Sequence, residues 1–269
     1  MSTKIKKIIG SGDCEGLRIL LNQNPSLAQQ PIEWGGLINK CRTEPLHYLS
    51  DGPFHGLWDH GKQAEMARIF LEAGAPVNGL PESGETPLHG AASLDRADVA
   101  QVLIEFGADL EVRAEYPGIR FGTPLEFAIF FGMREVSDLL YRHGARIYSS
   151  GMAAGVGDIE LLESMLPAGN LPTDGDVLRA AAVGGRIEVV QYLLDRGLDI
   201  NLPVSEATAL HWAAWEYKPA MVEFLLNQGA DRNIVDTNHK LTPLGWANHR
   251  AKNNSDSPEL AKIIAILGG

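Results

Sequence analysis

The chain has 269 residues, of which 45% are apolar and 21% are charged, as in an ordinary globular protein with enough apolar material for a core. Two cysteines, Cys14 and Cys41, are too few for a disulfide framework, so we expect a reducing compartment and a cytoplasmic location. The net charge of −11 argues against nucleic acid as a partner, and the absence of any signal-peptide run or membrane-length apolar segment argues against export and membrane insertion.

Apolar residues recur along the chain with a helical period and predict eight pairs of helices. The second helix of each pair carries adjacent apolar residues near its end, and these recur about every 35 residues on average. A glycine commonly follows, as at Gly107 and Gly229, where it can form the left-handed cap that ends a helix. In chain order, the predicted helices are 4–9 and 13–23, 45–51 and 62–73, 87–93 and 96–106, 124–131 and 133–143, 149–155 and 158–166, 176–183 and 186–196, 208–215 and 218–228, and 243–252 and 257–267.

Several of the predicted first helices begin with one short motif. It reads TPLHGAA at 86–92, TPLEFA at 123–128 and TALHWAA at 208–214, with weaker copies at 44–47 and 242–247. Threonine suits the N-cap position, and proline suits the first helical position because its missing N–H is not needed there. These segments resemble the ankyrin-repeat family, whose signature is T-P-L-H-x-A with a period of about 33 residues.

The resemblance implies an all-α fold, an ankyrin-repeat solenoid of about eight helix–turn–helix repeats with hairpin loops, in which each repeat contacts only its neighbours. We therefore expect one domain over residues 1–269 and a monomer. The expected repeats are 3–29, 40–78, 82–113, 119–147, 148–170, 172–202, 204–235 and 238–268.

The long spacing between the first two repeats contains a loop over 30–43 and an insert over 51–61. Long loops in compact repeats are often functional, so the insert could contact a partner through Trp58. A metal site would use its imidazole and carboxylate groups, from His55, Asp59 and His60. We favour a third interpretation, because the Gly/Pro-rich segment has no fixed ligand geometry. In this interpretation the insert packs its apolar side chains onto the solenoid: Phe54, Leu57 and Trp58.

The resemblance also implies which positions face the concave groove, namely the two that follow the alanine pair of each first helix. In the middle of the chain these positions are apolar: Leu94, Phe130, Phe131, Val156, Val183 and Trp215. An exposed apolar strip marks a binding surface, although the same side chains could instead fold onto neighbouring helices as core. Trp212 and Trp246 could form an aromatic corner with Trp215, or pack between repeats.

The signature histidines of the motif are implied to be structural hydrogen-bonding residues, at His47, His89 and His211. Glu126 and Arg179 occupy this position in two other repeats. Glu126 could make the same backbone hydrogen bonds as an acceptor, or could act as a general base. Arg179 could anchor a carboxylate or a phosphate.

We therefore predict a protein–protein interaction scaffold that binds a protein or peptide through its concave groove and hairpin loops. The chain has no P-loop, dinucleotide-binding glycine motif or G-x-S-x-G elbow, so we expect no cofactor and no metal and favour a non-enzymatic role. The alternative is a small-molecule or enzymatic site in the central groove around Glu126 and Arg179. The predicted partner-binding residues are Leu94, Phe130, Phe131, Val156, Val183, Trp212, Trp215, Glu126, Arg179 and Trp58.

Overall fold

A computed structural model of the chain describes residues 2–35, 40–80, 84–116, 119–166, 175–204, 206–252 and 257–268. The contacts divide the chain into two compact units. Unit 1 comprises residues 1–128 and 135–145, and unit 2 comprises residues 129–134 and 146–269. No helix within the described ranges is long and apolar enough to cross a membrane.

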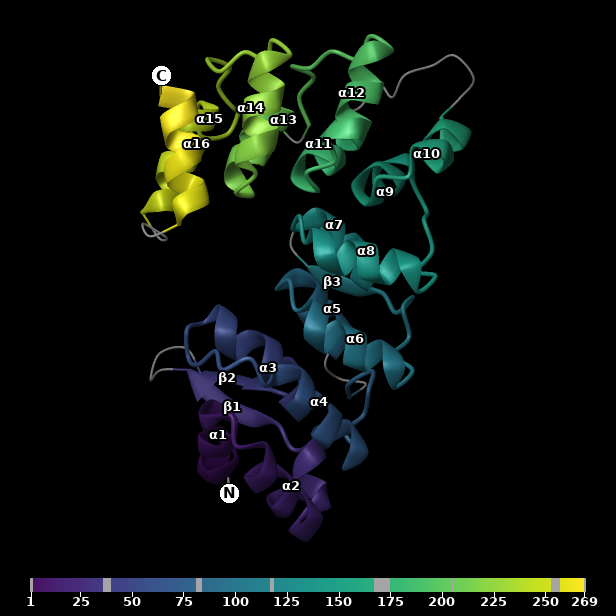
Figure 1. Ribbon diagram of the computed structural model, residues 1–269, viewed down its shortest axis with the longest axis vertical. Coiled ribbons are helices and arrows are strands. Elements are labelled where there is room, and N and C mark those ends of the chain that lie inside the picture. Colours follow the sequence, from purple (N-terminus) through teal and green to yellow (C-terminus); the bar gives the residue numbers. More distant parts are fainter. Residues whose placement is uncertain are drawn as a thin grey trace. The chain divides into compact units, whose positions relative to one another are not determined.

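Most of unit 1 consists of helix pairs, with two short antiparallel hairpins between them (Figure 1). In the first hairpin Ile32 lies opposite Thr43, and in the second Ala114 lies opposite Gly122. The helices are α1 (Ser2–Ser11), α2 (Cys14–Gln23), α3 (Pro45–Phe54), α4 (Gln63–Glu72), α5 (Pro87–Ser93), α6 (Ala97–Glu105), α7 (Pro124–Phe130), whose last two residues belong to unit 2, and α8 (Arg134–Arg142). The 3-10 helix η1 (Pro25–Gln29) and the strands β1 (Ile32–Gly35), β2 (Lys40–Thr43), β3 (Ala114–Tyr116) and β4 (Ile119–Gly122) complete it.

Unit 2 consists of four further helix pairs, which follow one another from α9 to the C-terminal helix in Figure 1. They are α9 (Ser150–Val156) and α10 (Ile159–Met165), α11 (Asp176–Val183) and α12 (Ile187–Asp195), α13 (Ala209–Trp215) and α14 (Pro219–Asn227), and α15 (Pro243–Ala251) and α16 (Pro258–Gly268).

Local signals fix where the first helices begin. Thr86 caps α5, because its hydroxyl accepts from the His89 N–H while the His89 ring accepts from the Thr86 N–H. Thr208 and His211 form the same reciprocal pair at α13. Such a capping box satisfies backbone N–H groups that have no partner inside the helix. The helix starts are therefore encoded in the repeated motif itself.

The core of unit 2 is continuous from one helix pair to the next. Fully buried alanines of the first helices, such as Ala181 and Ala213, lie beside fully buried leucines and valines of the second helices, such as Leu193 and Val222. Small alanines allow the neighbouring helix to approach closely, and the larger residues fill the space between the layers. Positions such as Gly229, with φ of 91°, end the second helices in the left-handed conformation that glycine tolerates.

The predicted helix pairs are confirmed, with bounds that differ by a few residues. The family resemblance implied hairpin loops between repeats, and the second hairpin is one of them. Residues 30–43 were expected to be a long loop, and there the structure instead forms the first hairpin. Helix α3 also extends through Phe54, into the segment that was expected to be a loop. The contacts divide the chain into two compact units, so the expectation of one domain over residues 1–269 stays a prediction.

Candidate partner-binding face

Three tryptophans of unit 2 form a contiguous group, here called the aromatic row: Trp212, Trp246 and Trp215. Trp246 on α15 contacts both tryptophans of α13 edge to face, with ring centroids 5.3 Å from Trp212 and 5.6 Å from Trp215. All three side chains are half-buried. Edge-to-face geometry is the favoured arrangement of aromatic pairs, so the row is well packed while part of each ring stays accessible. The tryptophans that were considered for an aromatic corner are in contact, and the same contacts are packing between adjacent repeats.

An arginine lies at each end of the aromatic row. The guanidinium carbon of Arg179 lies 5.7 Å from the Trp212 ring centroid and 5.5 Å from that of Phe130. The corresponding carbon of Arg250 lies 4.6 Å from the Trp215 centroid and 5.0 Å from that of Tyr217. These are cation–π distances, and a guanidinium that stacks on a ring still directs N–H groups outward from its edge.

The N–H groups of both arginines are incompletely satisfied. Asp176 accepts from Arg179 Nε at 3.1 Å and from Nη2 at 2.8 Å. Arg179 Nη1 and Arg250 Nε are buried, and neither has a hydrogen-bond partner among the described residues. A buried donor without an acceptor is costly, so both arginines have an N–H group that is poorly accommodated where it now lies.

A carboxylic acid lies within electrostatic reach of both arginines. Burial raises the pKa of Glu216 to about 7, and the positive charges of Arg250, Lys218 and Arg179 oppose this rise. Lys218 itself donates to the carbonyl oxygen of Gly132 at 2.9 Å. Near neutral pH, Glu216 is therefore divided between its charged form and a neutral form that can donate a hydrogen bond.

The remaining predicted groove residues divide into two groups. Phe130 and Phe131 are half-buried, contact each other edge to face at 5.1 Å between centroids, and lie in unit 2. Leu94 is half-buried at the end of α5 in unit 1. The exposure expected for Val156 and Val183 is wrong, because they are 7% and 0% exposed. Val183 packs against the backbone of Gly132, where there is no side chain to hold it out of the core.

Trp58 belongs to the insert, and the structure places it against the first repeat of unit 1. Its ring stacks on His60 with centroids 5.1 Å apart and covers Gly52 so closely that a Cβ there would lie 2.2 Å from the ring. His60 Nε2 lies 2.7 Å from the Ile9 carbonyl oxygen. The predicted packing of the insert is confirmed for Trp58. It is wrong for Phe54 and Leu57, which are 68% and 46% exposed.

The groups considered for a metal site have other contacts. His55 packs on Trp34 at 4.8 Å between centroids, and Asp59 accepts from Gln63 at 2.8 Å. The described residues contain no group of three or more potential ligands arranged to hold a metal ion.

The signature histidines connect adjacent repeats, as predicted. His89 Nε2 lies 3.1 Å from the Gly122 carbonyl oxygen, and His211 Nε2 lies 3.1 Å from that of Leu241. Burial lowers the pKa of His89 to about 4, so the ring is neutral. Each histidine therefore caps its own helix with one ring nitrogen and contacts the next repeat with the other.

Glu126 replaces the signature histidine and performs the same capping role. Its Oε2 accepts from the Thr123 N–H at 2.7 Å, while the Glu126 N–H donates to the Thr123 hydroxyl at 3.3 Å. Arg113 lies 3.8 Å from the same carboxylate oxygen. The acceptor interpretation is confirmed. Because these contacts occupy the carboxylate, they do not favour a general base at this position.

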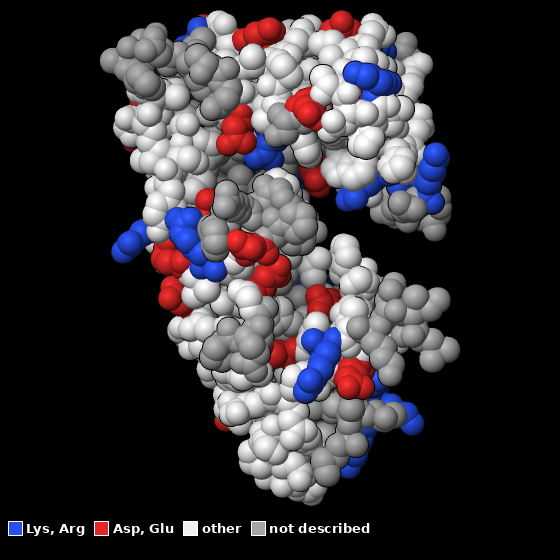
Figure 2. Space-filling model, turned by 180° about the vertical axis from the view of Figure 1, so that it is seen from behind, with Lys and Arg blue, Asp and Glu red and all other residues white. Residues whose placement is uncertain are grey.

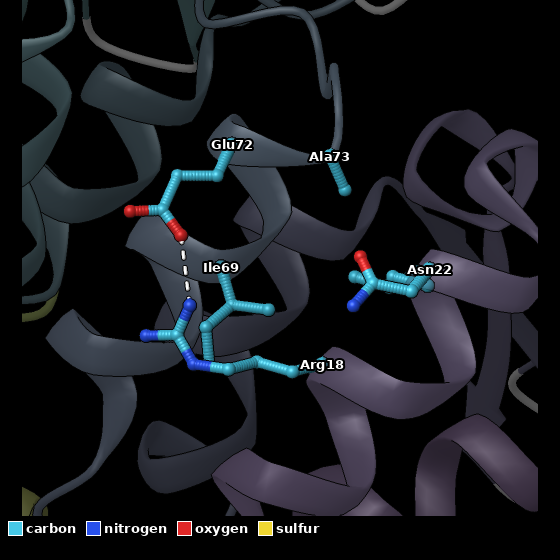
Figure 3. Close-up of a pocket in the computed structure, with 6 residues that line it drawn as sticks. Arg18, Asn22, Ile69, Glu72 and Ala73 are labelled. Carbon is cyan, nitrogen blue, oxygen red and sulfur yellow. Dashed lines mark hydrogen bonds and ion pairs between the residues drawn. The ribbon is translucent and has the colours of Figure 1, made fainter.

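A shallow cavity of about 100 Å³ lies between α2 and α4, where Arg18 and Glu72 form an ion pair at 2.9 Å across its rim (Figure 3). Small-molecule sites usually enclose about 300–1,000 Å³. This cavity is too small for such a ligand. On the face that Figure 2 shows, basic and acidic side chains are interspersed among uncharged ones rather than gathered into one basic area.

Sequence reasoning selected none of Tyr217, Glu216 and Arg250. The signal for Tyr217 was its place in the turn between the two helices of a repeat. Other repeats have glycine there with positive φ, for example Gly132 at 68° and Gly185 at 66°. Tyr217 adopts φ of 56°, a conformation that is strained for a bulky residue and often marks a functional site.

Two family models match the chain. The model for ankyrin repeats in three copies matches residues 151–236, which include the aromatic row except Trp246. The model for a single ankyrin repeat matches residues 83–115.

Known proteins also show the similarity. "Ankyrin repeat and KH domain-containing protein mask-1" of Caenorhabditis elegans is 32% identical over 186 residues, covering 64% of this chain and 7% of that protein. "B-cell lymphoma 3 protein homolog" of Mus musculus is 29% identical over 210 residues, covering 76% of this chain and 39% of that protein. This chain therefore spans only a part of these relatives. The crystal structure of the human ASB11 ankyrin repeat domain matches with a TM-score of 0.45 and 22% identity, over 97% of this chain and 96% of that one.

Proposed function

Because this chain belongs to the ankyrin-repeat family, we propose that it binds a protein or peptide partner through the first-helix face of unit 2. Ankyrin repeats are in general protein–protein interaction modules. The proposal also includes a monomer in the cytoplasm that binds neither nucleic acid nor membranes.

The observation that carries the proposal is the aromatic row with its two arginines. Tryptophan and arginine are the residue types most enriched among those that dominate binding energy at protein interfaces. Here they come from first helices of successive repeats, on a rigid scaffold that needs little ordering when a partner binds. Phe130 and Phe131 extend the same unit with further accessible aromatic surface.

The test compares partner capture by the wild-type chain and by variants of the face. We expect Trp215→Ala and Phe131→Asp to lose specific partners that the wild type retains, because they remove apolar anchors from the face. Phe106→Ala is the matched control, since Phe106 is 37% exposed at the end of α6, outside the proposed face. Circular dichroism and thermal melts establish that each variant is folded. If both folded variants retain every specific partner, the proposed face is not the binding site.

A further inference from the structure

We propose that Arg179, Arg250 and Glu216 form a receptor for a carboxylate, so that the partner of unit 2 is an acidic peptide segment with apolar neighbours. This inference rests on the proposed function and specifies its ligand. Its occupant is a segment of a partner protein that carries glutamate or aspartate side chains.

The first argument is the local charge. The chain as a whole has a net charge of −11, yet three cationic side chains, Arg179, Lys218 and Arg250, act on one buried carboxyl group. Asp176 pairs with Arg179 at 2.8 Å. The site is therefore locally positive on an acidic protein, and it becomes more positive when Glu216 is protonated. An acidic ligand matches this charge, whereas a basic ligand does not.

The second argument is the geometry of the donors. The guanidinium carbons of Arg179 and Arg250 each lie within cation–π distance of two aromatic rings, which restrains both side chains before a ligand binds. Each guanidinium has a buried N–H group without an acceptor in the described part of the chain, and an incoming carboxylate would reach it only after a shift of the side chain. A carboxylate has two acceptor oxygens and suits such donors through charge-assisted hydrogen bonds. The aromatic row between the arginines provides an apolar surface for the neighbouring side chains of the ligand.

The third argument is the backbone at Tyr217. The chain holds this residue at φ of 56°, where two other repeats of the same unit have glycine. The conformation places the Tyr217 ring against the Arg250 guanidinium, which Trp215 also contacts. Strain of this kind persists where the surrounding structure requires the side chain. Here the Tyr217 ring helps to position the Arg250 guanidinium that would contact the ligand.

Protonation of Glu216 gives the site a distinctive pH dependence. Its neutral form can donate a hydrogen bond to a ligand carboxylate, whereas its charged form repels that carboxylate. Arg250, Lys218 and Arg179 act on Glu216 directly. Asp176 pairs with Arg179, and the His249 ring stacks on Trp215. We therefore expect an acidic ligand to bind more tightly at pH 6 than at pH 8.

The experiment uses the full chain and three fluorescein-labelled peptides of alternating sequence. One peptide alternates glutamate with leucine, the second has glutamine in place of glutamate, and the third has lysine. We expect the glutamate peptide to bind at pH 6 at least about tenfold more tightly than the other two, as a charge-assisted hydrogen bond would provide. Arg250→Gln should remove most of this preference. Arg196→Gln is the control and should retain it, because Arg196 lies at the end of α12 and pairs with Glu163.

Three further variants separate the proposed mechanism from general charge effects. Glu216→Gln should bind the glutamate peptide equally well at pH 6 and pH 8, because its neutral amide does not titrate. His249→Gln should keep the wild-type pH dependence, which excludes the histidine as its source. Arg250→Lys keeps the positive charge but loses the planar donor edge, so it should bind several-fold more weakly than wild type. A thermal melt of each variant identifies any loss of folding.

The outcomes separate this inference from the proposed function. Equal binding of the glutamate and glutamine peptides, no binding of any peptide, or an unchanged pH dependence in Glu216→Gln would overturn the carboxylate receptor. The proposed function would still stand if Trp215→Ala and Phe131→Asp lost protein partners that Phe106→Ala retains. If those two folded variants retained every specific partner, the function assigned to this face would fail as well.

Discussion

Arg250 lies over the ring of Trp215, with its guanidinium carbon 4.6 Å from the ring centroid, and the two residues come from the first helices of adjacent repeats. The contact therefore helps to join α13 to α15. Arg250 also lowers the pKa of Glu216, so the packing of Arg250 on Trp215 affects the charge state of Glu216. If the proposed site binds its ligand, we expect a change at this contact to alter both binding and the stability of unit 2.

Glu216→Gln should change how the stability of the protein depends on pH. Burial raises the folded-state pKa of Glu216 from 4.5 to about 7, so the folded state favours the protonated acid. The contribution of Glu216 to the wild-type free energy of unfolding is greatest below pH 4.5. It falls as the pH rises from about 4.5 to 7 and is level above that. One pKa unit corresponds to about 1.4 kcal/mol, so the variant should gain up to about 3 kcal/mol relative to wild type between pH 4.5 and pH 8.

Urea titrations of both proteins across this range measure the difference. A constant difference between Glu216→Gln and wild type at all pH values would show that the carboxyl group has no raised pKa in the folded protein. The partial exposure of the site would reduce the size of the effect without changing its sign.

His89→Gln should destabilise unit 1 and reduce its sensitivity to acid. The buried His89 ring caps α5 and also contacts the Gly122 carbonyl, so the variant should lose about 1–3 kcal/mol of unfolding free energy at pH 7.5. The folded pKa of about 4 lies below the unfolded value of 6.5. The contribution of His89 to the wild-type free energy of unfolding is therefore fully present above pH 6.5 and is lost as the pH falls towards 4. Chemical denaturation at pH 7.5 and pH 5 tests both effects, and a variant that loses stability as steeply as wild type would contradict the second.

Glu126→His should be nearly neutral, whereas Glu126→Ala should cost about 1 kcal/mol. Glu126 accepts from the N–H of Thr123 in the way that His89 accepts from the N–H of Thr86, so histidine can restore the same capping box. Thermal melts of the two variants give the comparison. If Glu126→His lost as much stability as Glu126→Ala, the contact with Arg113, rather than the cap, would explain why glutamate occupies this position.

Gly52→Ala should destabilise unit 1 by about 1–3 kcal/mol, even though alanine is the better helix former. The added methyl group would lie 2.2 Å from the Trp58 ring, so the ring would have to move away. Gly10→Ala is the matched control, because its methyl group would lie 3.4 Å from the same ring, at ordinary contact distance. Melting temperatures of both variants test the expectation. Equal stability of the two would mean that Trp58 is not fixed against the first two repeats.

Much of the fold could be predicted because its determinants are local. The threonine–histidine caps at Thr86 and Thr208 and the left-handed glycine at Gly229 act within a few residues of each helix end. The first hairpin depends instead on pairing between segments such as Ile32 and Thr43, which the repeated motifs do not encode. Short strands of this kind are defined by their tertiary partners rather than by their own sequence.

The candidate site was predictable in position and less so in exposure. The alignment of equivalent positions in the repeats predicted that Trp212 and Trp215 lie on one face, and they do. The same alignment placed Val183 beside them, yet Val183 is fully buried because Gly132 leaves room for it. Whether a groove position is open depends on the size of the residues that pack against it, here a glycine from the repeat two before it in the chain. The unsatisfied N–H of Arg179 and the burial of Glu216 are likewise consequences of packing, which spacing alone does not reveal.

Tyr217→Gly separates the stability of the turn from the binding role of the side chain. Glycine accepts the left-handed conformation without strain, as it does at Gly132 and Gly185, so the variant should retain wild-type stability within about 1 kcal/mol. It removes the ring that contacts Arg250, so binding of the acidic peptide should weaken several-fold. A melt and a peptide titration on the same preparation give both quantities. A clear loss of stability with unchanged binding would assign Tyr217 to the fold alone, because the ring would then serve packing and not the position of the arginine.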